Sequence, residues 1–184
     1  NKKNFIKYYI KLNHEPTYEY LNIVKKKFIN SKVEIIISIG GGSTIDFSKG
    51  LGLLLRNKGN SENYMGFPKN LNTPVPVIAI PSTFNTGSEV VFNAVFTSIK
   101  QKKKLGINYN KNFPILSILE PRFISNSPKK LLLVSAFSVF CRAVETYTTP
   151  NSNYISKNYS LISYKLLCES IIKIFEKKNK NILN

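Results

Sequence analysis

The sequence predicts an α/β protein built on a parallel sheet. Apolar, strand-like runs at residues 35–39 and 76–80 alternate with stretches of helical periodicity at residues 18–30 and 43–56. Strand and helix in alternation is the order typical of a parallel sheet covered by helices. From Pro128 onward the sequence becomes helical throughout. We therefore expect an α/β domain at residues 1–127, followed by a helical domain at residues 128–184.

The first predicted elements flank a turn that contains a proline. Residues 5–12 alternate enough to form a strand, which Glu15-Pro16-Thr17 ends. Thr17 is a favoured residue type for the N-cap of the helix predicted at residues 18–30. The apolar residues of this helix recur at helical spacing and define one face, formed by Tyr20, Leu21, Val24 and Phe28.

The organising stretch of the first domain is residues 34–49. Its β-branched run at residues 35–39 predicts a central strand that helices cover on both faces. Three glycines at residues 40–42 then allow a tight turn, and Ser43 or Thr44 can cap the helix that follows. Free N–H groups and the positive end of the helix dipole would favour a phosphate at this turn. An ordinary glycine-rich turn remains the alternative, because short glycine motifs are weak evidence.

A second loop is expected beside this turn. The strand at residues 76–80 ends in a hydroxyl-rich loop at residues 81–89. Ligands of open α/β sheets bind at the carboxyl ends of the strands, so the loop and the glycine turn can meet over one ligand. Further strands are predicted at residues 90–99, 104–107 and 114–119. In the helical part, residues 129–147 and 152–177 each predict one helix, and an apolar stripe runs along the second, formed by Ile155, Tyr159, Ile162, Leu166, Ile171 and Ile174.

Composition narrows the class of protein. The chain has 184 residues, 42% of them hydrophobic, which predicts a globular fold. Its formal charge of +17 comes mostly from lysines spread along the whole chain. Such a spread is typical of a solvated surface, so we expect no nucleic-acid partner.

The sequence also bears on the compartment. No run approaches the roughly 18 apolar residues of a membrane span, and the first residues lack the pattern of a signal peptide. Cys141 and Cys168 do not suggest a disulfide framework, and their apolar surroundings predict buried thiols. We therefore expect a cytoplasmic protein without a membrane partner. The missing initiator Met suggests that the chain is part of a longer protein.

Three motifs carry a family resemblance. Residues 40–49 read Gly-Gly-Gly-Ser-Thr-Ile-Asp-Phe-Ser-Lys, and residues 78–90 read Ile-Ala-Ile-Pro-Ser-Thr-Phe-Asn-Thr-Gly-Ser-Glu-Val. Residues 143–147 read Ala-Val-Glu-Thr-Tyr, with Ile155-Ser156 beyond them. In order and spacing these motifs resemble the iron-containing (group III) alcohol dehydrogenase family, relatives of glycerol dehydrogenase and dehydroquinate synthase.

The resemblance implies a fold, an activity and a cofactor. It implies an incomplete Rossmann-like cofactor domain, followed by the first helices of an all-α domain that holds the metal and the substrate. The activity would be hydride transfer between NAD or NADP and a small alcohol or aldehyde, and a homo-oligomer would be in keeping with the family. The family's cofactor contacts fall on Gly41, Gly42, Ser43, Thr44, Ser82, Thr83, Thr86, Val95 and Lys104.

Two of these implied assignments have plain alternatives. Lys104 is one of 24 lysines among the 27 basic residues, and a solvated surface amine would explain it equally well. Asp46, which belongs to the glycine motif, is expected to act structurally near the start of its helix.

The metal-binding positions depart from the family. The resemblance places an Asp and a His of relatives at Ser138 and Arg142. A serine is a poor ligand for divalent iron or zinc, and a guanidinium stays protonated and repels a cation. Arg142 would instead pair with Glu145 or a backbone carbonyl, or hold an anionic substrate. The alternative function is therefore a homologue that keeps nucleotide binding but lacks metal-dependent catalysis.

Overall fold

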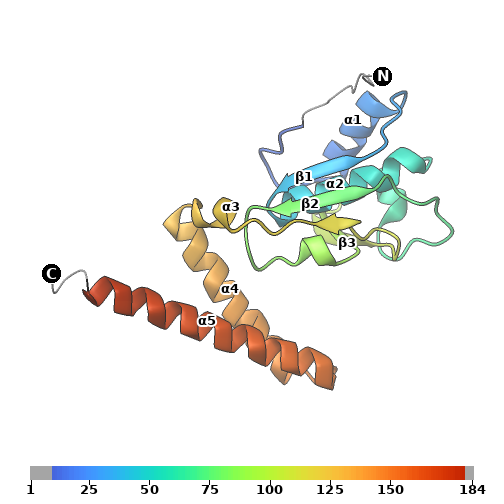
Figure 1. Cartoon of the computed structure of the whole chain (residues 1–184). Coiled ribbons are helices and arrows are strands. Elements are labelled where there is room, and N and C mark those ends of the chain that lie inside the picture. Colours follow the sequence, from blue (N-terminus) through green and yellow to red (C-terminus); the bar gives the residue numbers. More distant parts are fainter. Residues whose placement is uncertain (1–9, 181–184) are drawn as a thin grey trace. The chain divides into compact units, whose positions relative to one another are not determined.

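The computed structural model describes residues 10–180, which form two compact units. The first unit contains the described residues up to Ser82 together with Thr86–Phe123. The second contains Thr83–Asn85 and the chain from Ile124 onward. Figure 1 labels the elements of both units. A short helix, α3 (Pro121–Ser125), lies where the two units divide along the chain.

A three-stranded parallel sheet forms the framework of the first unit. Its strands are β1 (Ile36–Gly40), β2 (Val77–Pro81) and β5 (Leu116–Ser117), in the order β1-β2-β5. Ile36 pairs with Val77, and the register continues to Gly40 opposite Pro81. The sequence prediction of a mixed α/β fold with a parallel sheet is confirmed. Strand β5 is shorter than the predicted segment 114–119.

Two helices supply the apolar side chains that cover one side of this framework. Helix α2 (Gly42–Arg56) packs against β1 and β2, and α1 (Tyr18–Phe28) packs against α2. Thr17 Oγ1 accepts a hydrogen bond of 3.0 Å from the backbone N–H of Tyr20, so the predicted N-cap is confirmed. Of the strand predicted at residues 5–12, residues 5–9 lie outside the described residues and residues 10–12 have no regular structure.

An antiparallel hairpin closes the core of the first unit. Strands β3 (Asn93–Ser98) and β4 (Lys103–Asn108) pair with each other and lie within or close to the strands predicted at residues 90–99 and 104–107. Ala94 and Phe96 of β3 and Ile107 of β4 are fully buried and belong to the same hydrophobic cluster as the apolar face of α1. Two 3₁₀ turns, η1 (Ser61–Tyr64) and η2 (Ser88–Val90), complete the unit.

The prediction that residues 35–39 form a central strand with both faces covered is wrong for the described residues. Strand β1 lies at the edge of the sheet, next to β2 alone. Ser38 points toward α2 and is buried, whereas Ile37 and Ile39 are 60% and 57% exposed. Alternate side chains of a strand point to opposite faces, so one face of β1 packs on a helix and the other is open.

The second unit is built from two long helices. Helices α4 (Lys129–Thr148) and α5 (Tyr154–Lys180) pack side by side, and Ser160 Oγ donates a hydrogen bond of 2.5 Å to the Ala143 carbonyl. The apolar stripe predicted on α5 is largely exposed among the described side chains, including Ile155, Tyr159 and Leu166. One neighbouring helix covers one face of α5, which leaves this stripe open to solvent.

The prediction of two buried thiols is also wrong. Cys141 is exposed and Cys168 is partly buried, and both are free cysteines. Cys141 lies on α4, whose only buried residues are Ser135 and Ala143. Its apolar neighbours in the sequence therefore do not enclose it.

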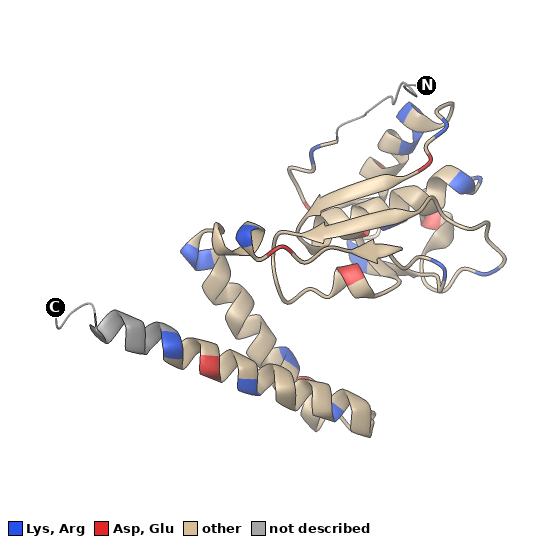
Figure 2. Ribbon diagram, in the orientation of Figure 1, with Lys and Arg blue, Asp and Glu red and all other residues tan. Residues whose placement is uncertain are grey.

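Charged side chains are scattered along the chain. Figure 2 shows Lys and Arg on helices and loops of both units, with few Asp and Glu among them. Within the first unit, three of these cations, Lys25, Lys26 and Lys27, lie in the last turn of α1.

A buried ion pair ties α2 to the hairpin. The Lys49 side chain is fully buried, and its Nζ lies 2.9 Å from Asp46 Oδ1. The same Nζ donates to the carbonyls of Ser88, Val91 and Asn93 at 2.9, 3.3 and 2.5 Å. Burial lowers the pKa of Lys49 below its ordinary value, and the Asp46 carboxylate opposes that shift. Asp46 therefore acts structurally, as expected.

We predict that Lys49→Met destabilises the chain by about 3–5 kcal/mol, because it leaves the Asp46 carboxylate and three carbonyls without their cation. Lys104→Met is the matched control. Lys104 pairs with Glu15 at the surface, where both side chains are more than half exposed, so its loss should cost at most about 1 kcal/mol. Urea unfolding followed by circular dichroism measures both. Equal losses in the two variants would contradict the prediction.

Candidate functional site

The glycine turn lies where β1 passes into α2, at the carboxyl edge of the parallel sheet. Gly41 is the N-cap of α2 with extended backbone angles (φ −77°, ψ −177°), and no side chain caps the helix. The prediction that Ser43 or Thr44 serves as the cap is therefore wrong, because the helix begins at Gly42 and both residues lie inside its first turn. The first N–H groups of a helix have no partner within it. This turn thus offers donors and the positive helix end to an anion.

Two of the glycines are required by close approach. A Cβ atom at Gly42 would lie 2.9 Å from the Cβ of Thr86, and one at Gly40 would lie 2.6 Å from Thr44 Oγ1. Real Cβ atoms do not approach other heavy atoms so closely. Gly42 therefore lets the hydroxyl-rich loop lie directly against the start of α2.

The structure brings two of the predicted hydroxyl residues to this turn. The Ser82 N–H donates to the Gly40 carbonyl at 2.9 Å, and Thr86 contacts the backbone at Gly42. Thr86 Oγ1 also accepts from the Ser88 N–H at 3.4 Å. Thr83 belongs to the second unit. The loop after β2 thus lies against the glycine turn at Ser82 and Thr86, and a shared ligand for Ser82, Thr83, Thr86 and the turn stays a prediction.

The remaining predicted cofactor residues lie on the hairpin. The Val95 N–H donates to Asp46 Oδ2 at 3.0 Å, which fixes β3 against the first turns of α2. Lys104 lies opposite Thr97 in the ladder, and Thr97 is two residues along the strand from Val95, so these three residues share one face of the hairpin. Lys104 forms an ion pair with Glu15. Its surface pairing is compatible with the plain alternative considered for this lysine.

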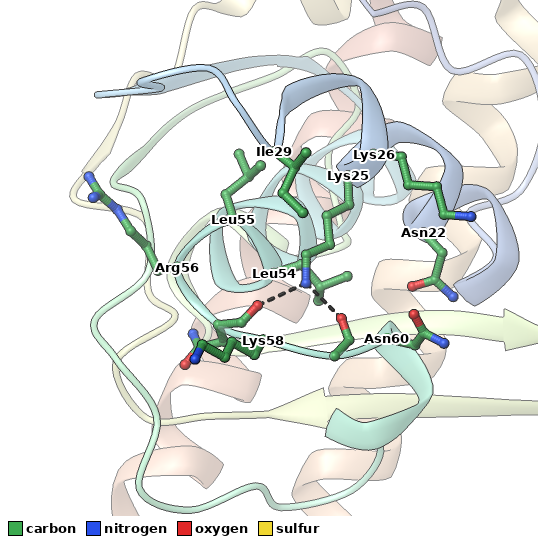
Figure 3. Close-up of a pocket in the computed structure, with 11 residues that line it drawn as sticks. Asn22, Lys25, Lys26, Ile29, Leu54, Leu55, Arg56, Lys58 and Asn60 are labelled. Carbon is green, nitrogen blue, oxygen red and sulfur yellow. Dashed lines mark hydrogen bonds between the residues drawn. The ribbon is translucent and has the colours of Figure 1, made fainter.

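One cavity of the first unit lies at the opposite end of α2 and has a structural role. Figure 3 shows that Lys25 reaches into this cavity, whose volume is about 430 Å³. Lys25 Nζ donates to the carbonyls of Asn57 and Gly59 at 2.8 and 2.6 Å. Burial lowers the pKa of Lys25. The amine satisfies carbonyl groups just beyond the end of α2, and the negative end of the helix dipole disfavours an anion there.

In the second unit, Ser138 and Arg142 both contact the loop residue Asn85. Ser138 Oγ donates to Asn85 Oδ1 at 3.3 Å, and Arg142 Nη1 donates to the Asn85 carbonyl at 3.2 Å. The prediction that Arg142 pairs with a carbonyl neighbour is thus confirmed. The family's metal does not fit these side chains, because a cation and a neutral hydroxyl replace its ligands. Within residues 10–180 no three His, Cys, Asp or Glu side chains gather into a group that could hold a metal ion.

A second cavity lies beside Arg142, between the two long helices. Its volume is about 380 Å³. The residues that α5 contributes are all hydroxyl-bearing and recur at i, i+3, i+4 and i+7, namely Ser156, Tyr159, Ser160 and Ser163. The sequence prediction placed Tyr159 in an apolar stripe of α5 and did not include the hydroxyl-bearing stripe. The helical spacing of Ser156, Ser160 and Ser163 in the sequence indicates this second stripe.

One helix among the described residues, α4, is long and apolar enough to cross a membrane by length and composition. The core helix of a soluble protein passes the same test, although only 11% of this stretch is buried. Arg142 and Glu145 also interrupt its apolar character in the second half. This feature is weak evidence for a membrane span.

These observations define the class of the chain. The first unit is a parallel α/β fold with an uncapped, glycine-rich strand-to-helix turn at the edge of the sheet where ligands bind. The sequence model of the family described as "Iron-containing alcohol dehydrogenase" matches residues 2–121. The chain belongs to this family.

Individual relatives agree with this assignment. NAD-dependent methanol dehydrogenase from Bacillus methanolicus is 30% identical over 146 residues, which cover 79% of this chain and 38% of the relative. 4-Hydroxybutyrate dehydrogenase from Clostridium kluyveri is 29% identical over 167 residues, covering 90% of this chain and 44% of the relative. Sulfoacetaldehyde reductase from Bifidobacterium kashiwanohense, solved in complex with NAD⁺, has a TM-score of 0.77 at 26% identity and covers 83% of this chain and 41% of that chain. The chain thus spans less than half the length of these relatives.

We predict that ferrous and zinc ions do not bind stoichiometrically at Ser138 and Arg142. Substitution to the family's pair, Ser138→Asp with Arg142→His, places two metal ligands on one helix face and should produce measurable binding. Calorimetric titration of both proteins with Zn²⁺ provides the test. Tight binding by the unsubstituted chain that disappears in Ser138→Ala would contradict the prediction.

Proposed function

We propose that this chain is the cofactor-binding part of an NAD(P)-dependent oxidoreductase that interconverts a small alcohol and its aldehyde. The observation that carries the proposal is the uncapped start of α2, held against the Thr86 loop with only a hydrogen at Gly42 between them. A pyrophosphate is the anion that such a turn suits in a parallel α/β fold. Family membership and the printed names of the relatives support the alcohol substrate.

Each proposed contact has a distinct task. The N–H groups of residues 41–43 would bind the pyrophosphate, since the Thr44 N–H already donates to the Gly41 carbonyl at 3.0 Å. The hydroxyls of Ser82 and Thr86 would orient the dinucleotide. Val95 and Lys104 would line the nicotinamide ribose from the hairpin. When bound, the nicotinamide supplies the hydride chemistry. The chain's own contribution is to hold that ring in a fixed position while solvent is excluded.

A second candidate function is a homologue that binds NAD(P) without metal-dependent catalysis. Ser138 and Arg142 favour it, because they replace the metal ligands of relatives. The two candidates are separated by an assay of NAD(P)H consumption with short aldehydes, beside metal analysis of the purified protein. Turnover that depends on added metal supports the first candidate, and nucleotide binding without turnover supports the second.

The proposed setting of the protein follows its chemistry. We propose a cytoplasmic enzyme whose partner is the small alcohol or aldehyde, without nucleic acid or membrane, and with self-association in keeping with the family. The relatives' names include both uncharged and anionic substrates, methanol on one side and 4-hydroxybutyrate and sulfoacetaldehyde on the other. The family alone therefore leaves the charge of the substrate open.

We predict that Ser43→Asp weakens NADH binding by at least about tenfold, because it puts a carboxylate beside the pyrophosphate. Ser43 is exposed in the first turn of α2, where an acidic residue favours the helix dipole, so the fold should not suffer. Ser43→Asn is the uncharged control of equal size and should bind nearly normally. Titration followed by NADH fluorescence measures both. Unchanged affinity in Ser43→Asp would refute the glycine turn as the pyrophosphate site.

A further inference from the structure

The cavity between α4 and α5 has a defined chemical character. Its wall on α4 is formed by residues spaced at i, i+3, i+4 and i+7, namely Val139, Arg142, Ala143 and Thr146. This face meets the serine-rich face of α5, and Asn85 completes the lining. The volume of about 380 Å³ lies within the range of small-molecule sites. Two helix faces in phase thus line a polar pocket that is open to solvent.

Arg142 gives this cavity a positive charge. No carboxylate is among the lining residues, so the Arg142 guanidinium is the one charged group at neutral pH in the described lining. A guanidinium is planar and carries five N–H donors, a geometry that matches two oxygens of a carboxylate or phosphate. Arginine therefore favours an oxyanion in the cavity over an uncharged or cationic ligand.

The serine hydroxyls add a second requirement. Ser160, Ser163 and Ser156 donate their protons to the backbone carbonyls of Ala143, Tyr159 and Asn153 at 2.5, 2.9 and 3.0 Å. Each hydroxyl oxygen has two lone pairs that accept hydrogen bonds, and one of those on Ser156 already accepts from the Asn153 N–H at 3.1 Å. The α5 side of the cavity therefore suits a ligand that donates, such as an alcohol. One end of the ligand would be anionic and another would carry a hydroxyl group.

The geometry of Asn85 is an independent observation at the same place. Its φ is +94°, in the region that residues other than glycine rarely adopt. Its carbonyl accepts from Arg142 Nη1 and its side-chain oxygen accepts from Ser138. Strained backbone of this kind concentrates at ligand-binding sites, where it orients functional groups. Here it holds the backbone oxygen that contacts the guanidinium.

We propose that the cavity between α4 and α5 binds a small oxyanion that also carries an alcohol group, held by Arg142 at its anionic end. The place that relatives use for a metal would then serve as an anion site. The existence of this anion site does not depend on nucleotide binding. The further statement that the enzyme's substrate is a hydroxy acid or a hydroxyalkyl phosphate rests on the proposed function.

The test uses probes that differ by one group, titrated calorimetrically into the whole chain without nucleotide. Lactate and glycerol 3-phosphate carry both required groups, propionate lacks the alcohol, and propane-1,2-diol lacks the anion. We expect saturable binding of lactate or glycerol 3-phosphate in the millimolar range, weaker binding of propionate, and no binding of propane-1,2-diol. The tighter of the first two identifies the anionic group.

Variants locate the site. Arg142→Gln should weaken binding by about tenfold or more, because it removes a charge-assisted hydrogen bond, and Arg142→Lys should keep part of it. Lys157→Gln removes an equal charge from the same helix pair without touching the cavity lining, and should bind as the unsubstituted chain does. Circular dichroism confirms that each variant folds.

The contrary outcomes are equally distinct. Absence of saturation with both hydroxylated anions, or equal weakening by Lys157→Gln and Arg142→Gln, would overturn the site. Equal binding of lactate and propionate would remove the alcohol from the proposal. NADH titration of the same samples shows separately whether the glycine turn functions, so failure of one proposal is not mistaken for failure of the other.

Discussion

The first unit depends on the buried pair formed by Lys49 and Asp46. A lysine without exposed surface is tolerated only because a carboxylate and three backbone carbonyls surround its amine. These carbonyls belong to η2 and to the segment that enters β3, so one side chain joins the hydroxyl-rich loop to α2. Asp46 joins β3 to the same helix through Val95. The relative placement of the glycine turn, the loop and the hairpin is therefore set by one group of buried charges.

Much of the first unit could be predicted from the sequence because its elements carry local signals. The strand at residues 76–80, the N-cap at Thr17 and the glycine turn each follow from residue type and order. The environment of β1 could not be predicted in this way. A run of isoleucines indicates a strand suited to burial on both faces, but whether both faces are covered depends on contacts distant in the sequence. The position of the N-cap at Gly41 could not be predicted either, because Ser43 and Thr44 are the residue types with the higher intrinsic preference for an N-cap.

The candidate sites divide in the same way. Residues 40–44 and the loop after β2 could be identified from the sequence because each belongs to a recognisable motif. The structure brings Ser82 and Thr86 of that loop to the glycine turn. The cavity between α4 and α5 has no familiar motif. Its polar spacing was masked by the stronger apolar pattern on the same helix, and Asn85 comes from a loop more than 50 residues away along the chain. Sequence periodicity identifies helix faces, but it does not say which faces meet.

The open face of β1 has a consequence for how the chain behaves in solution. Among residues 10–180, β1 pairs with β2 alone and exposes Ile37 and Ile39, and an edge strand beside an apolar surface is the usual starting point for strand-to-strand association. The formal charge of +17 opposes this contact by mutual repulsion between copies. That repulsion acts over a Debye length of about 30 Å at 0.01 M salt but only about 10 Å at 0.1 M. We therefore expect association of the chain to increase with ionic strength. At low salt, repulsion between the lysines of different copies keeps the apolar faces of their β1 strands from meeting.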